Sequence, residues 1–309
     1  MQLLFNNKKK LAVIVLICSA SAAGCRFYFQ KSTDHFTALK TSRSLENGKN
    51  LAVNICAGCH YNESSKKYTG IPLNDLPKIA GKLYSANLTH SVAHGRIEQY
   101  SDAELFYLVK TGISKSGKFM PYMMRPTMAD GDINDLILYF RSDDSPLAAS
   151  DSTFGKTRIN LIGRMGIRLA SKPAPYVKNV ARPDENNLVD YGRYLVGIIG
   201  CYHCHSKKVL GLNYLNPEKS KGYLQGGLKL KDFEGKRVFA SNLTPDKSTG
   251  IGRLSPDDFS RAVKEGISPS GRKLSAPMPV FSDMTTRQAS AIYAYLQQLP
   301  PVHHAVKSK

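Results

Sequence analysis

The 309-residue sequence lacks several features that would place it in common classes of protein. Beyond the N-terminus no apolar run is long enough to cross a bilayer. No alternating pattern of note predicts β-strands, and the short motifs of serine hydrolases, zinc peptidases and phosphate-binding loops are missing. These absences disfavour an integral membrane protein, an all-β fold and the commonest hydrolytic activities.

The first 25 residues have the pattern of an export signal. Three lysines at 8–10 precede a short apolar run at 11–17. Small residues at 20–22 suit a signal peptidase, whereas those at 22–24 precede Cys25 and resemble a lipobox. A cysteine at that position would carry acyl chains and tether the protein to a membrane. We predict export to the periplasmic side, with a lipoprotein anchored at Cys25 as the favoured form and a cleaved, unlipidated chain as the alternative.

The six cysteines leave no pair for a structural disulfide. Cys18 lies inside the apolar run and Cys25 at the proposed cleavage site. The other four form two C-x-x-C-H motifs, Cys56-Ala57-Gly58-Cys59-His60 and Cys201-Tyr202-His203-Cys204-His205. An exported protein without disulfides is unusual unless its cysteines have another function.

This motif attaches haem covalently in c-type cytochromes. Two thiols about one helical turn apart reach the two vinyl groups, and the following His lies beneath the iron. Chance gives about 0.003 such motifs in a chain of this composition. Zinc sites seldom place His directly after the second Cys, and a thioredoxin-type pair needs a βαβ context that is missing. We predict two haem c groups, attached through Cys56, Cys59, Cys201 and Cys204, with His60 and His205 as iron ligands.

The two halves of the chain repeat each other around these motifs. The matching segments are 48–51 and 192–195, 85–89 and 240–244, 109–118 and 263–272, and Met120-Pro121 and Met278-Pro279. Each half therefore has the same order: helix, haem motif, loop, helix, Met-Pro loop, helix.

Helix signals support this order. Segments 45–56 and 189–201 are compatible with helices that lead into the motifs, and segments 101–112 and 255–266 begin with Ser and end at Gly. The last helix of each half has apolar residues at i, i+3, i+4 and i+7, namely Ile133, Leu136, Ile137 and Phe140, and Ala289, Ile292, Tyr293 and Leu296.

We therefore predict a mainly α fold with two tandem class I cytochrome c domains. The first domain covers residues 40–142 and the second 188–302. Residues 143–187 carry Ser, Asp, Pro and Gly without strong periodicity and are predicted to be a surface linker, in which 160–170 could form a short helix. Residues 303–309 form a short basic tail.

Electron transfer requires a second axial ligand on each iron, and a thioether is the usual one in cytochromes c. Met120 and Met278 are the candidates, because each lies before the last helix and is followed by a Pro that stiffens the backbone. The first half leaves alternatives open. Met123 is the runner-up to Met120 in a stretch that also contains Met124 and Met128, and His90 or His94 could instead give bis-His ligation.

The segment Asn242–Gly252 resembles a motif of the cytochrome c subunits of membrane-bound alcohol, gluconate and fructose dehydrogenases. The order of elements in Ser255–Met278 and the ending Leu299–Val302 are also similar to that family. The resemblance covers residues 45–142 and 188–302. It implies an electron carrier that accepts electrons from a flavin or quinoprotein dehydrogenase and passes them to quinone or a terminal oxidase.

The sequence departs from that family in two ways. Those subunits typically carry three haems whereas this chain has two motifs, and the first half lacks the Pro-Asp-Lys portion after Asn87. A di-haem cytochrome c peroxidase is an alternative, but it needs an open or displaceable sixth site. A terminal-oxidase subunit is another, but it would need a transmembrane anchor. We expect an electron-transfer subunit without independent catalysis.

The formal net charge of +19 bears on the choice of partner. Export argues against nucleic acid. An anionic membrane surface or an acidic redox partner protein fits better, although a basic surface also keeps a protein soluble.

Overall fold

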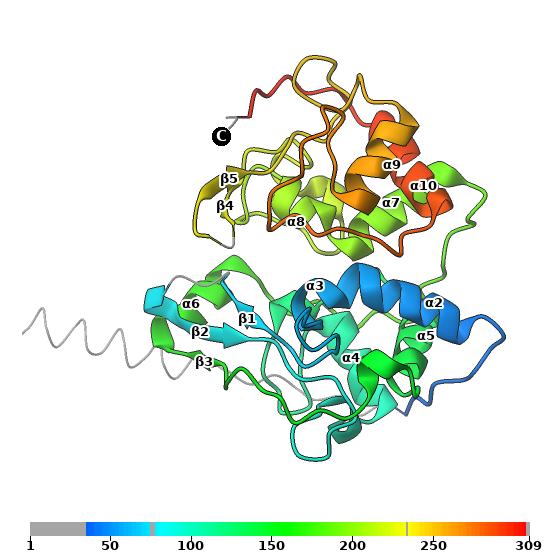
Figure 1. The fold of residues 1–309 in the computed structure, drawn as a ribbon, viewed down its shortest axis with the longest axis vertical. Helices are drawn as coiled ribbons and strands as arrows, with labels where there is room; N and C mark the ends of the chain where they lie inside the picture. The colour runs from blue at the N-terminus through cyan, green and yellow to red at the C-terminus, as the bar shows by residue number, and fades with distance from the viewer. Residues whose placement is uncertain (1–34, 75–77, 233, 307–309) are drawn as a thin grey trace, which may run out of the picture.

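The computed structural model describes residues 35–74, 78–232 and 234–306 (Figure 1). The predicted signal, with Cys25, and the last three residues of the basic tail lie outside the described residues. Within those ranges no helix combines the length and apolar character needed to cross a membrane.

The expectation of a mainly helical fold is confirmed. The α-helices are α2 (Ser44–Leu51), α3 (Ala57–His60), α4 (Asp102–Thr111), α5 (Asp130–Phe140), α6 (Leu161–Ala170), α7 (Leu188–Ile199), α8 (Cys201–His205), α9 (Pro256–Glu265) and α10 (Thr286–Gln297). The shorter helical segments are the π-helix η1 (Ala52–Cys56) and the 3₁₀ turns η2 (Lys78–Ala80), η3 (Ile97–Gln99), η4 (Pro121–Met123), η5 (Ser145–Leu147) and η6 (Pro217–Lys219).

Two small antiparallel sheets accompany the helices, and the sequence did not predict them. One has the strand order β1-β2-β3, built from β1 (Pro72–Leu73), β2 (Gly81–Tyr84) and β3 (Arg158–Ile159). The other pairs β4 (Lys229–Lys231) with β5 (Arg237–Phe239). Strands of two to four residues are too short to show a recognisable alternation.

The elements fall into two groups, one above the other in Figure 1. Helices α2 to α5 lie in one group, together with the first sheet, and α7 to α10 lie in the other with β4 and β5. The stretch 143–187 contributes to the first group, because β3 adds a strand to its sheet and α6 packs against η2.

The same close helix crossing occurs in each group, between α2 and α5 and between α7 and α10. A Cβ at Gly48 would lie 2.1 Å from the carbonyl oxygen of Asp135, and a Cβ at Gly192 would lie 1.9 Å from that of Ala291. Any side chain would overlap a backbone atom at either position. The two glycines that align in the sequence repeat therefore have the same structural role.

Helices α4 and α9, which correspond in the repeat, are bounded as the sequence predicts. Ser101 and Ser255 both form capping boxes, with Glu104 and Asp258 respectively. Both helices end at a glycine in the left-handed region, Gly112 in α4 and Gly266 in α9. Local sequence signals thus fix where these helices begin and end.

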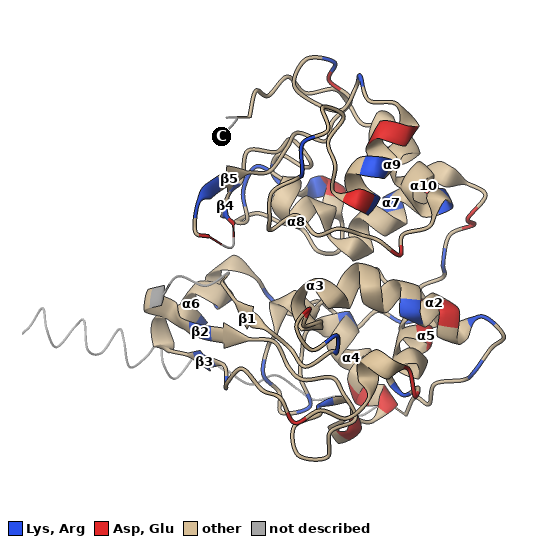
Figure 2. Cartoon of the chain, viewed as in Figure 1, with Lys and Arg blue, Asp and Glu red and all other residues tan. Residues whose placement is uncertain are grey.

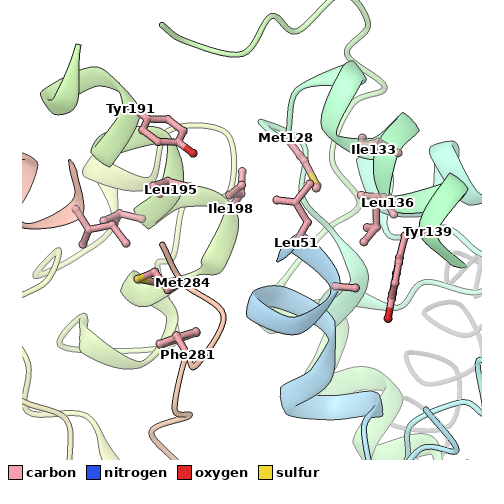
Figure 3. Packing of buried hydrophobic residues seen from close by; sticks show 14 of the residues in the cluster. Leu51, Met128, Ile133, Leu136, Tyr139, Tyr191, Leu195, Ile198, Phe281 and Met284 are labelled. Atoms are coloured by element: carbon pink, nitrogen blue, oxygen red, sulfur yellow. The ribbon is translucent and has the colours of Figure 1, made fainter. Parts of the chain in front are cut away.

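The buried apolar side chains form one cluster that crosses from one group to the other. Figure 3 shows Ile198 of α7 beside Leu51 and Met128 of the first group. All three are buried. The contact between the groups is therefore part of the hydrophobic core.

Polar contacts fasten the same interface. The Tyr194 hydroxyl on α7 accepts a hydrogen bond from the Ala129 backbone N–H at 3.0 Å and donates to Asp132. Asn50 of α2 donates to the carbonyl of Asp283 at 2.6 Å and accepts from Gln288 at 2.8 Å. These bonds join segments on both sides of the buried apolar contact.

Replacing either crossing glycine with alanine is expected to destabilise the protein. Gly48→Ala or Gly192→Ala places a methyl group about 2 Å from a backbone carbonyl, so the helices must separate at a cost of about 3 kcal/mol. Denaturation in urea followed by circular dichroism measures the loss. Gly131→Ala is the control, since a Cβ at that position of α5 meets nothing within 4 Å. It should leave stability unchanged or raise it by about 0.5–1 kcal/mol. Equal stability of Gly48→Ala and wild type would contradict the role of the crossing.

Candidate haem sites

A short helical turn carries each C-x-x-C-H motif, and a long helix leads into it. In the first motif Cys56 ends the π-helix η1, and Cys59 and His60 lie in α3. In the second motif all five residues form α8, which a left-handed Gly200 (φ 87°) separates from α7. The sequence predicts a helix reaching each first cysteine. The first half confirms this, since the helical backbone continues from α2 through the π-helix η1 to Cys56. In the second half α7 ends at Ile199, and Gly200 redirects the chain before Cys201.

The chemical state of the thiols fits haem attachment better than a redox-active pair. None of Cys56, Cys59, Cys201 and Cys204 forms a disulfide. Burial raises the pKa of Cys56 and that of Cys201 to about 12. Thioredoxin-type cysteines have lowered pKa values, because they act as thiolates. Cys56 and Cys201 are instead held as neutral thiols.

Each motif histidine is buried and oriented by a backbone carbonyl. The Nδ1 atom of His60 lies 2.8 Å from the carbonyl oxygen of Ala86, and Nδ1 of His205 lies 2.8 Å from that of Ser241. A carbonyl oxygen only accepts, so Nδ1 donates and the lone pair of the neutral ring is on Nε2. Burial lowers the pKa of both imidazoles, which favours this neutral form. Both rings are therefore prepared to bind a metal through Nε2.

An Asn-Leu-Thr segment follows each of these carbonyls and fixes its position. The Asn87 side-chain oxygen accepts hydrogen bonds from the backbone N–H and the hydroxyl of Thr89, both at 2.8 Å. Asn242 accepts the same two bonds from Thr244, at 2.9 and 2.8 Å. The carbonyl that orients each histidine is thus directly adjacent to a buried, hydrogen-bonded asparagine.

The amide group of each asparagine also holds the chain that follows the last helix of its group. Asn87 donates to the carbonyl of Ser150 at 2.7 Å, and Asn242 donates to that of Val302 at 2.8 Å. The sequence repeat located Asn-Leu-Thr in both halves but did not predict this function. Its recurrence was the available signal.

Two polar atoms beside the first motif are buried without a hydrogen-bond partner, the side-chain oxygen of Asn54 and the hydroxyl of Tyr68. Buried polar groups are rarely left unpaired, so a group that supplies a partner is expected there. The two motif cysteines, a neutral imidazole and an unpaired hydroxyl form a donor set that fits covalent haem with its polar propionates.

The methionine loops of the two halves are not superimposable. The Met120 N–H donates to the carbonyl of Gly112 at 2.7 Å, and the matching bond in the second half joins Leu274 to Gly266, also at 2.7 Å. Met120 therefore occupies the backbone position of Leu274, and Met278 comes four residues later. The Met120 side chain is 40% exposed, whereas Met278 packs against the core.

The other methionines of the first loop have different environments. Met124 is buried, and its sulfur accepts a hydrogen bond from the Ala174 N–H at 3.1 Å. Met128 is fully buried in the core. Met123, in η4, is half-buried. The side chains of Met120 and Met123, in contrast, are neither fully buried nor given a hydrogen-bond partner on sulfur in the described part of the chain.

The two histidines of the bis-His alternative lie in unfavourable positions. His90 has a partner on each ring nitrogen, Glu98 at 2.7 Å from Nδ1 and the Ser142 carbonyl at 2.9 Å from Nε2. His94 is exposed. A ligand role for either would require rearrangement of this loop.

His203, between the second pair of cysteines, is not part of the donor set. It is half-buried, its ring packs against Tyr202 and Tyr214, and its buried Nε2 atom has no hydrogen-bond partner. Burial lowers the pKa of His203 to about 3, so the ring is neutral.

Arg125 connects the first methionine loop to the helix that leads to the second motif. Its guanidinium donates to the Ile198 carbonyl at 2.8 Å and, within its own loop, to the carbonyls of Tyr122 and Met124 at 3.1 and 2.9 Å. Its charge acts on residues of both motifs, since it opposes the rise in the pKa of Cys56 and contributes to the low pKa of His203. One cation thus lies between the two candidate sites.

The helical C-x-x-C-H turns and the buried, Nε2-directed histidines are features of c-type cytochromes. The chain is similar to one group of them, the cytochrome c subunits of dehydrogenases, as the sequence resemblance predicted. The fructose dehydrogenase cytochrome subunit of Gluconobacter japonicus is 28% identical over 281 residues, which is 83% of this chain and 53% of that protein. No family model matches the chain.

Two further relatives cover less of the chain. The gluconate 2-dehydrogenase cytochrome c subunit of Pantoea cypripedii is 34% identical over 39% of this chain and 25% of its own length. The cytochrome c subunit of the quinone alcohol dehydrogenase of Gluconobacter oxydans is 27% identical over 68% of this chain and 44% of its own length. The chain spans about half or less of the length of these relatives.

We call the hydrogen bonds made by the side chain of Asn87 or Asn242 the asparagine brace of that half. Removing the brace at Asn242 is expected to weaken the second site. Asn242→Ala deletes the acceptor for Thr244 and the donor to Val302. The loss of these buried bonds should lower the free energy of unfolding by about 2–3 kcal/mol. Urea denaturation measures it, and Asn186→Ala, which removes an exposed contact with Arg287, is the control with an effect below about 0.5 kcal/mol. A variant as stable as wild type would show that the brace is dispensable.

Proposed function

We propose that this protein is an exported electron carrier with two covalently bound haems. The observation that carries the proposal is that His60 and His205 are buried and oriented in the same way. Both rings are buried, and both donate through Nδ1 to a backbone carbonyl at 2.8 Å, in a helical turn that also carries the two motif cysteines. Haem attached at each motif supplies a one-electron redox centre, whose potential a thioether ligand raises.

We further propose that residues 40–142 and 188–302 are two class I cytochrome c domains, with 143–187 as the connection. The support is the repetition of structure. The glycine crossing, the histidine–carbonyl bond, the bonds from asparagine to threonine and the capping box that begins α4 or α9 occur in both segments, in the same order.

The proposed route of electrons follows from the relatives. Their names describe subunits of fructose, gluconate and alcohol dehydrogenases. We propose that a membrane-associated dehydrogenase donates electrons to this protein, which passes them to quinone, a cytochrome or a terminal oxidase. The proposed location is the periplasmic side, with acyl chains on Cys25 as the anchor. In this role the protein has no catalysis of its own, and hydrogen-peroxide turnover by the half-reduced protein would instead indicate a peroxidase.

The proposed sixth ligands are Met278 and Met120, with Met123 as the alternative to Met120. Met278→Leu should remove about half of the long-wavelength Met–Fe(III) absorption band, because one of two haems loses its thioether. Met120→Leu and Met123→Leu then decide the first site, since the true ligand removes the other half. Met124→Leu is the control and should keep the full band. A full band in Met278→Leu would refute that ligand, and a full band in both Met120→Leu and Met123→Leu would refute methionine ligation in the first half.

Arg125 should influence both redox centres. A cation between them stabilises the reduced form of each haem relative to the more positive oxidised form. Arg125→Gln is therefore expected to lower both midpoint potentials in a spectroelectrochemical titration. Arg125→Lys keeps the charge but not the fork of donors, so it should preserve the potentials better than Gln.

The control for this titration is Arg261→Gln, which removes a surface cation paired with Asp258 and should leave both potentials nearly unchanged. Unchanged potentials in Arg125→Gln would show that this cation does not act on the haems.

A further inference from the structure

Helix α6 has an unusually apolar exposed face. Four of its ten residues are large apolar side chains at least half exposed, namely Leu161, Ile162, Met165 and Leu169. At 100° per residue these four positions fall within one 100° sector of the helix. Leu169 is 82% exposed. We call these four residues the α6 face.

The side of α6 opposite the α6 face packs against the first group of elements. The fold therefore holds the α6 face outward. Gly163 lies on the opposite side, and a Cβ there would lie 2.4 Å from the Ala80 carbonyl oxygen and 2.6 Å from a methyl group of Ile159. Asn160 caps the helix by accepting from the Gly163 N–H and donates to the Ile79 carbonyl at 2.7 Å. A glycine contact and a capped start hold one side of α6 inward and the α6 face outward.

An additional exposed apolar residue lies near the start of α6, where its carbonyl accepts from Asn160. Ile79 belongs to η2, against which α6 packs, and it is 69% exposed. Contiguous exposed apolar surface of this kind marks an interaction site more often than scattered single residues do.

The charge around the α6 face has one sign. Between residues 152 and 183 there is no Asp or Glu, whereas Lys156, Arg158, Arg164, Arg168 and Lys172 flank or belong to the helix. Strands β2 and β3, like α6, carry Lys or Arg and no acidic residue (Figure 2). Both Arg164 and Arg168 lie on the same side of the α6 face, at its edge, by the same helical geometry.

We propose that the α6 face docks on an anionic lipid bilayer, with the helix parallel to the membrane surface. An amphipathic helix with Leu, Ile and Met on one face and arginines at the edge lies in the bilayer interface, where its apolar side chains enter the acyl boundary and its cations meet lipid phosphates. Long arginine side chains can extend from the edge of the face to the headgroups.

This surface is separate from both candidate haem sites and from the proposed lipid at Cys25. It supplies a second membrane contact, in addition to the acyl chains proposed on Cys25. Docking through α6 also fixes which side of the first group faces the lipid.

The test uses the full-length, haem-loaded protein with Cys25→Ser, so that no acyl chain at that position can hold it to lipid. This parent should cosediment with vesicles of phosphatidylcholine and phosphatidylglycerol, and only weakly with phosphatidylcholine alone. The triple change Leu161→Ser, Met165→Ser and Leu169→Ser should lower the partition coefficient at least about tenfold. Arg158→Gln with Arg168→Gln should lower binding and reduce its dependence on salt.

The matched control is Val92→Ser with Leu210→Ser, which removes two apolar side chains that are 98% and 63% exposed elsewhere on the surface. It should bind like the parent, and the Soret spectrum of every variant should match that of the parent. Failure of the parent to bind anionic vesicles would overturn the proposal. So would a serine variant that binds like the parent, and if that variant also lost copurification with a dehydrogenase, the α6 face would be a protein interface instead.

Discussion

The close approach of two helix backbones is the constraint on which each half of this protein depends. Gly48 and Gly192 allow α2 and α7 to contact the carbonyls of α5 and α10, at distances that no side chain permits. The same two helices lead into the C-x-x-C-H turns. The crossing therefore fixes the direction in which the chain enters each motif. It also fixes where α5 and α10 end, and so where the segments containing Ser150 and Val302 begin.

The segments that follow α5 and α10 connect the crossing helices to the motif histidines. Segments after α5 and α10 supply the carbonyls of Ser150 and Val302, to which Asn87 and Asn242 are hydrogen-bonded. Each asparagine is adjacent to the carbonyl that orients a motif histidine. A disturbance of the helix ends could thus reach the imidazole through a short series of hydrogen bonds. Second-shell contacts of this type set the tautomer and basicity of metal-ligating histidines in general.

The interface between the two groups is both apolar and polar, and it lies next to both motifs. Ile198 is buried against the first group while its carbonyl accepts from Arg125. Because Ile198 comes three residues before Cys201, this contact holds the second motif close to the methionine loop of the first half. The two proposed haems, held in this way, would exchange electrons within one molecule, which suits the proposed role between a dehydrogenase and the respiratory chain.

The sequence by itself determined the two haem motifs, the repeat, the helix ends at Ser101, Ser255, Gly112 and Gly266, and the mainly helical fold, because these depend on spacing and caps within a few residues. The tertiary structure alone decided which carbonyls orient His60 and His205, how Met120 lies relative to Leu274, and that β3 and α6 join the first group. Those features are contacts between segments tens of residues apart, where packing rather than local preference selects the partner. The short strands were missed for the same reason, since two-residue pairings have no periodicity of their own.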